Sequence, residues 1–153
     1  MNLEKLRTEI AEDEGVVYKV YLDHLGLPTC GIGHLITEDD EEFGKPVGTR
    51  ITEERVIELF DADVQSVLDD CQKLYKNFFD LPEEIQLIVA NMMFNMGYTR
   101  LSQFKMMKAA VEAGNWLEAA EQMKDSRWAK QVPNRANRLI ARMKAVNNAK
   151  KEG

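Results

Sequence analysis

The stretch that decides the fold of this chain runs from residue 14 to residue 36 and reads EGVVYKVYLDHLGLPTCGIGHLI. Its first part is rich in β-branched and aromatic side chains, which favour extended strands. Residues 23–28 then supply Asp, Gly and Pro, the side chains typical of a turn, and a second apolar run follows. This pattern predicts a β-hairpin or a small antiparallel sheet over residues 16–36.

Helical periodicity flanks this stretch on both sides. Before it, apolar side chains recur at threes and fours over residues 3–13, and Gly15 supplies a stop. After it, residues 37–50 are acidic and interrupted by glycine and proline, which predicts a surface loop. From Thr52, a suitable N-cap, the helical spacing of apolar residues continues through residue 74 and predicts a long helix.

The second half of the chain has a helical pattern throughout. Residues 85–96 are apolar on nearly every side, so this helix should be buried, and Gly97 should end it. Three polar residues could cap further helices: Ser102, Asn115 and Asn134. Trp116 and Trp128 could stack on sugars or fill the core, and their helical spacing beside apolar neighbours favours the core.

Together these elements indicate an α+β protein. We expect one domain over residues 1–153, with a β-containing lobe at 14–58 and a larger all-helical lobe formed by 1–13 and 77–153. The helix at 53–76 would connect the lobes. A cleft between two lobes is the usual place for a ligand, so we expect the active site there.

Composition places the chain among ordinary globular proteins. Of its 153 residues, 44% are apolar and 30% are charged, a balance that excludes the disordered and fibrous classes. The N-terminal segment lacks the apolar core of a signal peptide, and residues 85–96 are too few to span a bilayer. We therefore expect synthesis in the cytoplasm and no integral membrane segment. Cys30 and Cys71 are expected to be free thiols.

The net charge of −6 hides an asymmetry along the chain. Residues 1–70 carry 6 Lys and Arg against 18 Asp and Glu, whereas residues 71–153 carry 14 against 8. Such a basic half marks either a surface for a polyanion, such as nucleic acid or an anionic cell wall, or a solvated helical face. The chain is acidic overall, which disfavours a nucleic-acid binder that uses the basic residues of 135–144.

Three residues of the quoted stretch could carry acid–base chemistry. Glu14 lies at a helix end, Asp23 at the close of the first strand and Thr29 on the returning strand, so a hairpin can bring them to one edge. Glycoside hydrolysis needs one carboxylic acid to protonate the leaving oxygen and a second carboxylate to direct water or stabilise positive charge. Gly31 and Gly33 would allow close approach of a backbone or a sugar.

With this ordered spacing the sequence resembles the phage-type lysozymes (endolysins, N-acetylmuramidases; glycoside hydrolase family 24). Their mark is a Glu-Gly near the N-terminus, followed by Asp, Thr and then Gly-Ile-Gly-His. Further segments are similar to the family in the family order: ITEERVIELFDADV from residue 51, NMMFNMG from residue 91, Trp128 and QVPNRANR from residue 131. The resemblance covers nearly the whole chain and implies a lysozyme-like fold.

The resemblance also implies roles for individual residues. Glu14 would be the general acid, Asp23 the second carboxylate, and Thr29 a hydroxyl that positions the attacking water in an inverting, single-displacement reaction. The positions that match those lining the sugar cleft are Gly33, Leu35, Phe94 and Asn95. Val132 stands where the family presents a hydroxyl to the substrate, and Cys30 stands where an aliphatic side chain is usual.

The resemblance places four further residues in supporting positions. His34 would be a structural partner of Asp63 on the long helix. Arg135 would lie near the catalytic glutamate, with Asn91 beside it. The sequence shows no Cys and His cluster at metal-ligand spacing and no phosphate-binding loop, so we expect no metal and no cofactor.

The implied function is hydrolysis of the β-1,4 bond between N-acetylmuramic acid and N-acetylglucosamine in bacterial peptidoglycan, for host cell lysis. A monomeric endolysin of this kind accumulates in the host cytoplasm and reaches the wall in the periplasm through holes made by a separate holin. The alternative is a non-catalytic module that binds peptidoglycan or belongs to a phage structure. Intact Glu14, Asp23 and Thr29 favour the enzyme.

Overall fold

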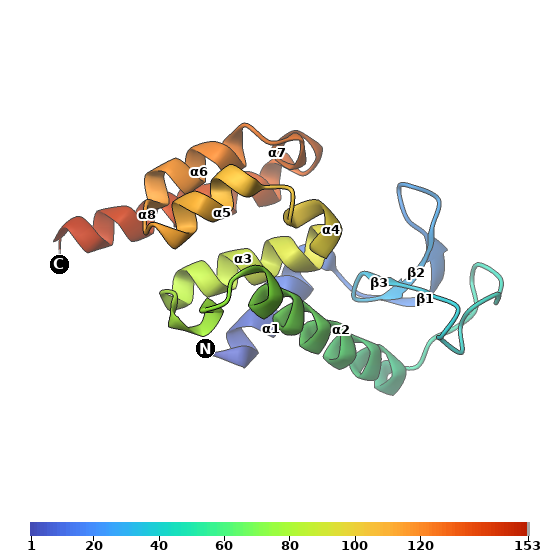
Figure 1. Cartoon of the computed structure of the whole chain (residues 1–153). Coiled ribbons are helices and arrows are strands. Elements are labelled where there is room, and N and C mark those ends of the chain that lie inside the picture. Colours follow the sequence, from blue (N-terminus) through green and yellow to red (C-terminus); the bar gives the residue numbers. More distant parts are fainter. Residues whose placement is uncertain (153) are drawn as a thin grey trace. The chain divides into compact units, whose positions relative to one another are not determined.

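The computed structural model describes the backbone of residues 1–152 and the side chains of residues 1–146. Figure 1 shows its elements, coloured along the chain. In chain order they are α1 (Leu3–Glu14), β1 (Val17–Leu22), β2 (Pro28–Gly31), β3 (His34–Leu35), α2 (Glu53–Leu74), a 3-10 turn (Phe78–Asp80), α3 (Glu83–Met96), α4 (Tyr98–Leu101), α5 (Lys105–Glu112), α6 (Trp116–Lys124), α7 (Arg127–Gln131) and α8 (Pro133–Glu152). Helices together with a small antiparallel sheet confirm the predicted α+β class.

The chain divides into two compact units. The β unit comprises residues 7–66, and the helical unit comprises residues 67–153 together with 1–6. The long helix α2 begins in the β unit, where the Thr52 Oγ1 accepts a hydrogen bond of 3.1 Å from the Arg55 N–H. Thr52 is therefore the N-cap that the sequence predicts, since its hydroxyl satisfies a donor of the first helical turn.

The sheet of the β unit is a meander with strand order β1-β2-β3, and both pairings are antiparallel. Tyr21 is in register with Thr29 across β1 and β2, and Thr29 is in register with Leu35 across β2 and β3. The predicted small sheet over residues 16–36 is thus confirmed. The register between Val17 and Tyr21 shifts, which marks a bulge or irregularity in β1.

A small apolar core holds the β unit together. Its buried members come from the sheet, the segments that follow it and the start of α2: Val20, Cys30, Ile36, Ile51, Val56 and Leu59. Cys30 is completely buried and free, as is Cys71 in the helical unit, so the predicted free thiols are confirmed. Burial raises the pKa of Cys30 to about 11, so this thiol stays protonated and packs as a small hydrophobic side chain.

The acidic loop over residues 37–50 is anchored to α2 by a buried ion pair. Glu42 is only 3% exposed and accepts two hydrogen bonds from Arg55, of 2.8 Å from Nε and 2.9 Å from Nη2. A bidentate pair of this kind fixes the orientation of both side chains. The predicted surface loop therefore carries one residue that is part of the interior.

The helical unit is built around α3, whose residues are buried on most sides as the sequence predicts. Helices α3 and α6 both pack against α8, and α5 packs against α6 (Figure 1). Trp116 and Trp128 are 4% and 2% exposed, so both belong to the core, as their spacing predicts. No helix in the described part of the chain is long and apolar enough to cross a membrane.

Two of the predicted helix caps are wrong. Asn115 does cap α6 by accepting a hydrogen bond of 3.2 Å from the Glu118 N–H. Ser102 instead donates its hydroxyl to the Thr99 carbonyl at 2.9 Å, because it follows the short helix α4, which the sequence pattern does not reveal. Asn134 lies inside the first turn of α8, which begins at Pro133.

Candidate active site

Asp23 stands at the tip of the hairpin that joins β1 to β2. Its Oδ1 accepts hydrogen bonds of 2.8 Å from the Leu25 N–H and 2.9 Å from the Leu27 N–H. Two hydrogen bonds also fix its backbone. The Asp23 N–H donates to the Leu27 carbonyl, and the Asp23 carbonyl accepts from the Gly26 N–H, both at 2.9 Å. The hydrogen bond from Leu27 contributes most to holding the pKa of Asp23 below its ordinary value, so this carboxyl is an ionised acceptor at neutral pH.

Thr29 follows this tip on β2 and is only 5% exposed. Its Oγ1 donates a hydrogen bond of 2.9 Å to the carbonyl oxygen of Leu27. Because the hydroxyl proton is used in this way, the oxygen of Thr29 is oriented to accept a hydrogen bond from another molecule. The backbone of Leu27 thus holds both Asp23 and Thr29 in place.

Glu14 is the last residue of α1, and its carboxyl lies directly over Gly33. A Cβ built on Gly33 would lie 2.7 Å from the Glu14 Oε1 and 3.1 Å from its Cδ. Gly33 also has a φ of +61°, a backbone conformation that other residues rarely adopt. The close approach that the sequence suggests for Gly33 is therefore made by the candidate acid itself.

Tyr21 lies on β1, two residues before Asp23. After burial, the negative charges of Glu14 and then Asp23 are the main causes that raise the pKa of Tyr21 above its ordinary value. A phenol is harder to ionise beside negative charges, which is the physical reason for this direction. The Tyr21 Cα is in register with Thr29, and the Glu14 carboxyl lies over Gly33 just after β2. Glu14, Asp23 and Thr29 all belong to the β unit, and their meeting at one edge stays a prediction.

His34 lies on β3, immediately after Gly33, and is held by two carboxylates. Its Nδ1 lies 2.7 Å from the Asp63 Oδ2, which is the pairing that the family resemblance implies. Its Nε2 lies 2.8 Å from the Asp40 Oδ2, a second partner that the sequence does not reveal. Burial disfavours a charged imidazole, but the two carboxylates outweigh it and raise the pKa of His34 to about 8.

The stability of the protein should therefore depend on the protonation of His34. The pKa is raised above the ordinary value of about 6.5, so the stabilisation is complete below pH 6.5 and disappears as the pH rises through 8. We expect the free energy of unfolding to decrease between pH 6 and pH 9. This decrease should be larger in the parent than in His34→Gln, by about 2 kcal/mol. Denaturant unfolding at both pH values measures this difference.

The matched control is His24→Gln, which removes the other histidine of the chain and should keep the parent's pH dependence. If the parent and His34→Gln instead gave parallel curves, the two carboxylates would not be stabilising a protonated His34.

The remaining predicted site residues divide between the two units. In the β unit, Leu35 is 47% exposed and in register with Thr29, which leaves an apolar surface beside the candidate site. In the helical unit, Arg135 is buried and its Nε donates to the Asn91 Oδ1 at 2.8 Å, so the expected Arg135–Asn91 network is present.

Asn95 and its neighbours complete the predicted set in the helical unit. The Asn95 Oδ1 accepts a hydrogen bond of 2.7 Å from the indole Nε1 of Trp128, which fixes the amide against the core. Phe94, at the C-terminal end of α3, and Val132, between α7 and α8, are both partly buried. Their predicted contacts with a sugar stay predictions.

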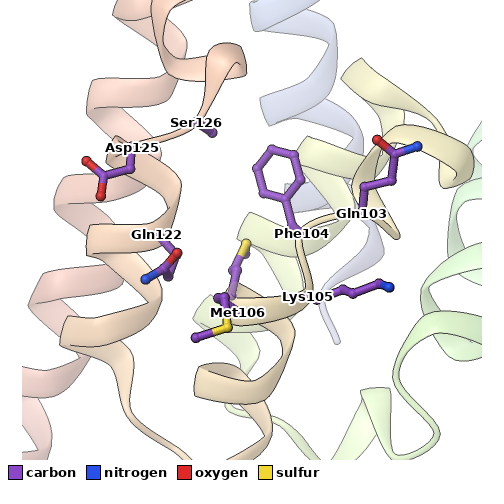
Figure 2. A pocket seen from close by; sticks show the side chains of 8 residues that line it. Gln103, Phe104, Lys105, Met106, Gln122, Asp125 and Ser126 are labelled. Atoms are coloured by element: carbon purple, nitrogen blue, oxygen red, sulfur yellow. The ribbon is translucent and has the colours of Figure 1, made fainter.

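The helical unit also has a pocket of about 270 Å³ between α5 and α6 (Figure 2). Phe104 and Met106 line one side of it, and Gln122 and Asp125 line the other. None of the predicted site residues, all of which the structure describes, contributes to its walls. The candidate site is therefore the edge of the β unit and not this pocket.

Three features of the structure around these residues are absent from the predictions made from the sequence. Tyr21 could have been found, because it lies two residues before Asp23 and alternate residues of a strand share a face. The backbone of Leu27 gives no such signal, since any residue offers the same N–H and C=O groups. Asp40 lies in a loop without periodicity, so nothing in the sequence distinguishes it from the four other carboxylates over residues 38–42.

The sequence is similar to several known proteins. The sequence matches the phage lysozyme family over residues 11–145. It is 32% identical to probable T4-type lysozyme 1 of Dictyostelium discoideum, over 84% of this chain and 87% of that protein. It is also 32% identical to the pre-baseplate central spike protein Gp5 of Enterobacteria phage T4, over 85% of this chain and 26% of that protein.

A third relative is the peptidoglycan hydrolase gp36 of Pseudomonas phage phiKMV, which is 28% identical over 90% of this chain and 15% of that protein. The family match begins just before Glu14 and includes every predicted site residue. The chain therefore belongs to the phage lysozyme family.

Proposed function

We propose that this protein hydrolyses the β-1,4 bond between N-acetylmuramic acid and N-acetylglucosamine, with Glu14 as the general acid. As a member of the phage lysozyme family it is a lysozyme-type peptidoglycan hydrolase, and the proposal specifies the bond and the mechanism. The observation that carries it is that the β unit holds both carboxyl groups at its small sheet, with Glu14 over Gly33 just after β2 and Asp23 in the turn between β1 and β2. Glycosidases need two carboxyl groups at one site.

In this mechanism Glu14 gives its proton to the glycosidic oxygen as the bond to the anomeric carbon breaks. Gly33 lies under the carboxyl of Glu14 without a side chain, so the carboxyl can sit close to the backbone of the β2–β3 turn. This turn limits the positions that the donor can take. A fixed donor is valuable because proton transfer requires hydrogen-bond distance to the leaving oxygen.

Asp23 and Thr29 would bind the attacking water. The hydrogen bonds from the Leu25 and Leu27 N–H groups both end on Oδ1 of Asp23, so Oδ2 can accept one proton of the water. The oxygen of Thr29, whose own proton goes to Leu27, can accept the other. The water would then direct a lone pair at the anomeric carbon and transfer a proton to Asp23, which gives a single displacement with inversion.

The test of this function uses purified protein and isolated cell walls or bacteria stripped of their outer membrane. We expect the turbidity to fall and new reducing ends to appear in parallel, since each bond hydrolysed frees one reducing end. Proton resonance of the nascent sugar should show the α anomer, which is the inverted configuration. Binding of the walls without clearing would contradict the proposed hydrolysis.

One comparison favours a second candidate role for the same activity. The pre-baseplate central spike protein matches this chain over only 26% of its own length, so a lysozyme domain of this type occurs within a protein named for a phage particle. This supports a virion-associated lysozyme as the alternative to a monomeric endolysin released from the host cytoplasm by a holin. Fractionation of an infected culture separates them, because only the former stays with purified particles.

A further inference from the structure

A second surface feature lies on β1 of the β unit, beyond the residues used in the proposed reaction. It is an open groove of about 540 Å³ lined by Val16, Val17, Tyr18, Lys19, Gly48 and Arg50. The segment over residues 48–51 runs along the edge of β1, where the Gly48 N–H donates to the Val20 carbonyl at 2.8 Å and the Ile51 N–H donates to the Tyr18 carbonyl at 3.0 Å. Backbone hydrogen bonds on both sides therefore fix the walls of this groove.

The groove brings two positive charges together. Lys19 and Arg50 form an antiparallel bridge, so they stand directly opposite each other across the two segments. Like charges in this position destabilise a sheet. Neither side chain has an ion pair or side-chain hydrogen bond with any residue of the described part of the chain.

Of the other three cations of the β unit, two have carboxylate partners, and Lys45 has no ion pair with the described residues. Residues 7–66 contain 15 Asp and Glu but only 5 Lys and Arg, so carboxylate partners are abundant. Arg7 pairs with Asp61, and Arg55 pairs with Glu42. Lys19 and Arg50 thus form an uncompensated cationic pair in an acidic unit, and a bound anion would remove their repulsion.

The walls of the groove indicate which kind of anion fits. Beside the two cations, Val16 and Tyr18 are 45% and 46% exposed and present apolar surface. A ligand that carries a carboxylate next to short aliphatic groups would use both kinds of wall. A long polyanion would fit less well. The β unit has three times as many carboxylates as cations, so the carboxylates would repel most of the charges of such a polymer, and the two cations could attract only a few of them.

The groove also lies within reach of the candidate active site. Lys19 precedes Asp23 by four residues on β1, which corresponds to roughly 13 Å along a strand. A tripeptide extends up to roughly 10 Å. The stem peptides of peptidoglycan begin at the lactyl group of N-acetylmuramic acid and carry free carboxylates. A stem on a sugar held at Asp23 would therefore cover most of this distance, and the lactyl group and the long, exposed Lys19 side chain would cover the rest.

We propose that the groove between Lys19 and Arg50 binds a carboxylate of the peptidoglycan stem peptide. This inference rests on the proposed function for the identity of the substrate, but the binding itself requires no cleavage. It makes the groove a specificity site, at which the protein would distinguish stem-bearing glycan from bare glycan chains. The site is separate from Glu14, Asp23 and Thr29 and would act on substrate binding.

The binding test uses the isolated stem tripeptide L-Ala-γ-D-Glu-diaminopimelate, which has no glycosidic bond. In a resonance titration at low salt, we expect the amide signals of Lys19 and Arg50 to shift on addition of the peptide. Arg50→Gln should weaken binding about fivefold, as the loss of one partly exposed ion pair does. Lys45→Gln removes an exposed cation of the same loop that does not line the groove, and it should bind like the parent.

A stability measurement tests the repulsion independently. At low ionic strength Arg50→Gln should raise the thermal midpoint, because it removes the electrostatic repulsion between Arg50 and Lys19. We expect this although the substitution makes an acidic unit more acidic. Lys45→Gln should not raise it. The tripeptide should raise the midpoint of the parent but not that of Arg50→Gln.

Activity gives a third test, with intact glycan that carries stem peptides and glycan from which an amidase has removed them. The preference for the stem-bearing glycan, measured as the ratio of the two kcat/KM values, should fall about fivefold in Arg50→Gln. It should stay at the parent's value in Lys45→Gln. If the tripeptide failed to bind, or bound Arg50→Gln as tightly as the parent, the proposed site would be wrong. Binding of a glycerol-phosphate polymer in place of the tripeptide would overturn the stem assignment too. A protein that binds the tripeptide but releases no reducing ends would contradict the proposed function and leave this site in place.

Discussion

Replacement of Glu14 by Gln is expected to lower kcat on isolated cell walls by about 10³-fold, because an amide cannot give a proton to the leaving oxygen. Gln has the size of Glu and can occupy the same place over Gly33, so the thermal midpoint should stay close to that of the parent. The rate of release of reducing ends, measured on equal amounts of folded protein, gives this ratio. Walls should still bind to the variant.

The matched control for this substitution is Glu12→Gln, which removes an exposed carboxylate from the same helix. It should retain nearly the full rate. A Glu14→Gln variant that cleared walls at more than a tenth of the parent's rate would not be compatible with Glu14 as the proton donor.

Gly33→Ala should lower both the catalytic rate and the free energy of unfolding. The new Cβ would lie 2.7 Å from the Glu14 Oε1, so the candidate acid would have to move, and a displacement of about 1 Å can cost about 100-fold in rate. The φ of +61° adds backbone strain of about 1 kcal/mol. Steady-state kinetics on walls and denaturant unfolding measure the two effects separately.

Gly44→Ala distinguishes these causes. Gly44 has a φ of +81° but nothing lies within 4 Å of where its Cβ would be. Gly44→Ala should therefore lower the free energy of unfolding, as Gly33→Ala does, but leave the catalytic rate unchanged. If Gly33→Ala lost no more activity than Gly44→Ala, the contact between Gly33 and Glu14 would have no part in catalysis.

The elements that could be predicted from the sequence are those with a strong period. The β-branched and aromatic side chains and the turn chemistry of residues 16–36 predict the sheet, and the apolar run of residues 85–96 predicts the buried helix α3. Short elements cannot be predicted in this way, because the four residues of α4 make barely one helical turn and show no periodicity. Ser102 illustrates this, since α4 ends just before it and turns a potential cap into the donor of a bond to Thr99.

The site could be predicted as a set of side chains but not as a set of contacts. Glu14, Asp23 and Thr29 follow from their spacing around one hairpin, and their catalytic roles stay predictions. The sequence suggests that Gly33 permits a close approach, yet which group approaches depends on where α1 ends. The second partner of His34 depends in the same way on the path of an irregular loop that carries Asp40.

Hydrogen bonds made by the backbone are the least visible feature in the sequence. Leu27 orients both Asp23 and Thr29 through its N–H and its carbonyl, while its side chain takes no part. The bridge between Lys19 and Arg50 is similar, because the two residues are 31 positions apart and only the chain path places them opposite each other. Patterns within one element cannot reveal such pairs.

The most direct test of the central claim is the identity of the sugar end that the protein creates. Walls digested by the parent are reduced with borohydride and hydrolysed, and the amino sugar alcohols are then separated. The account predicts muramitol in proportion to the fall in turbidity, and none above background with Glu14→Gln. Glucosaminitol as the new end, or clearing without any new reducing end, would contradict it.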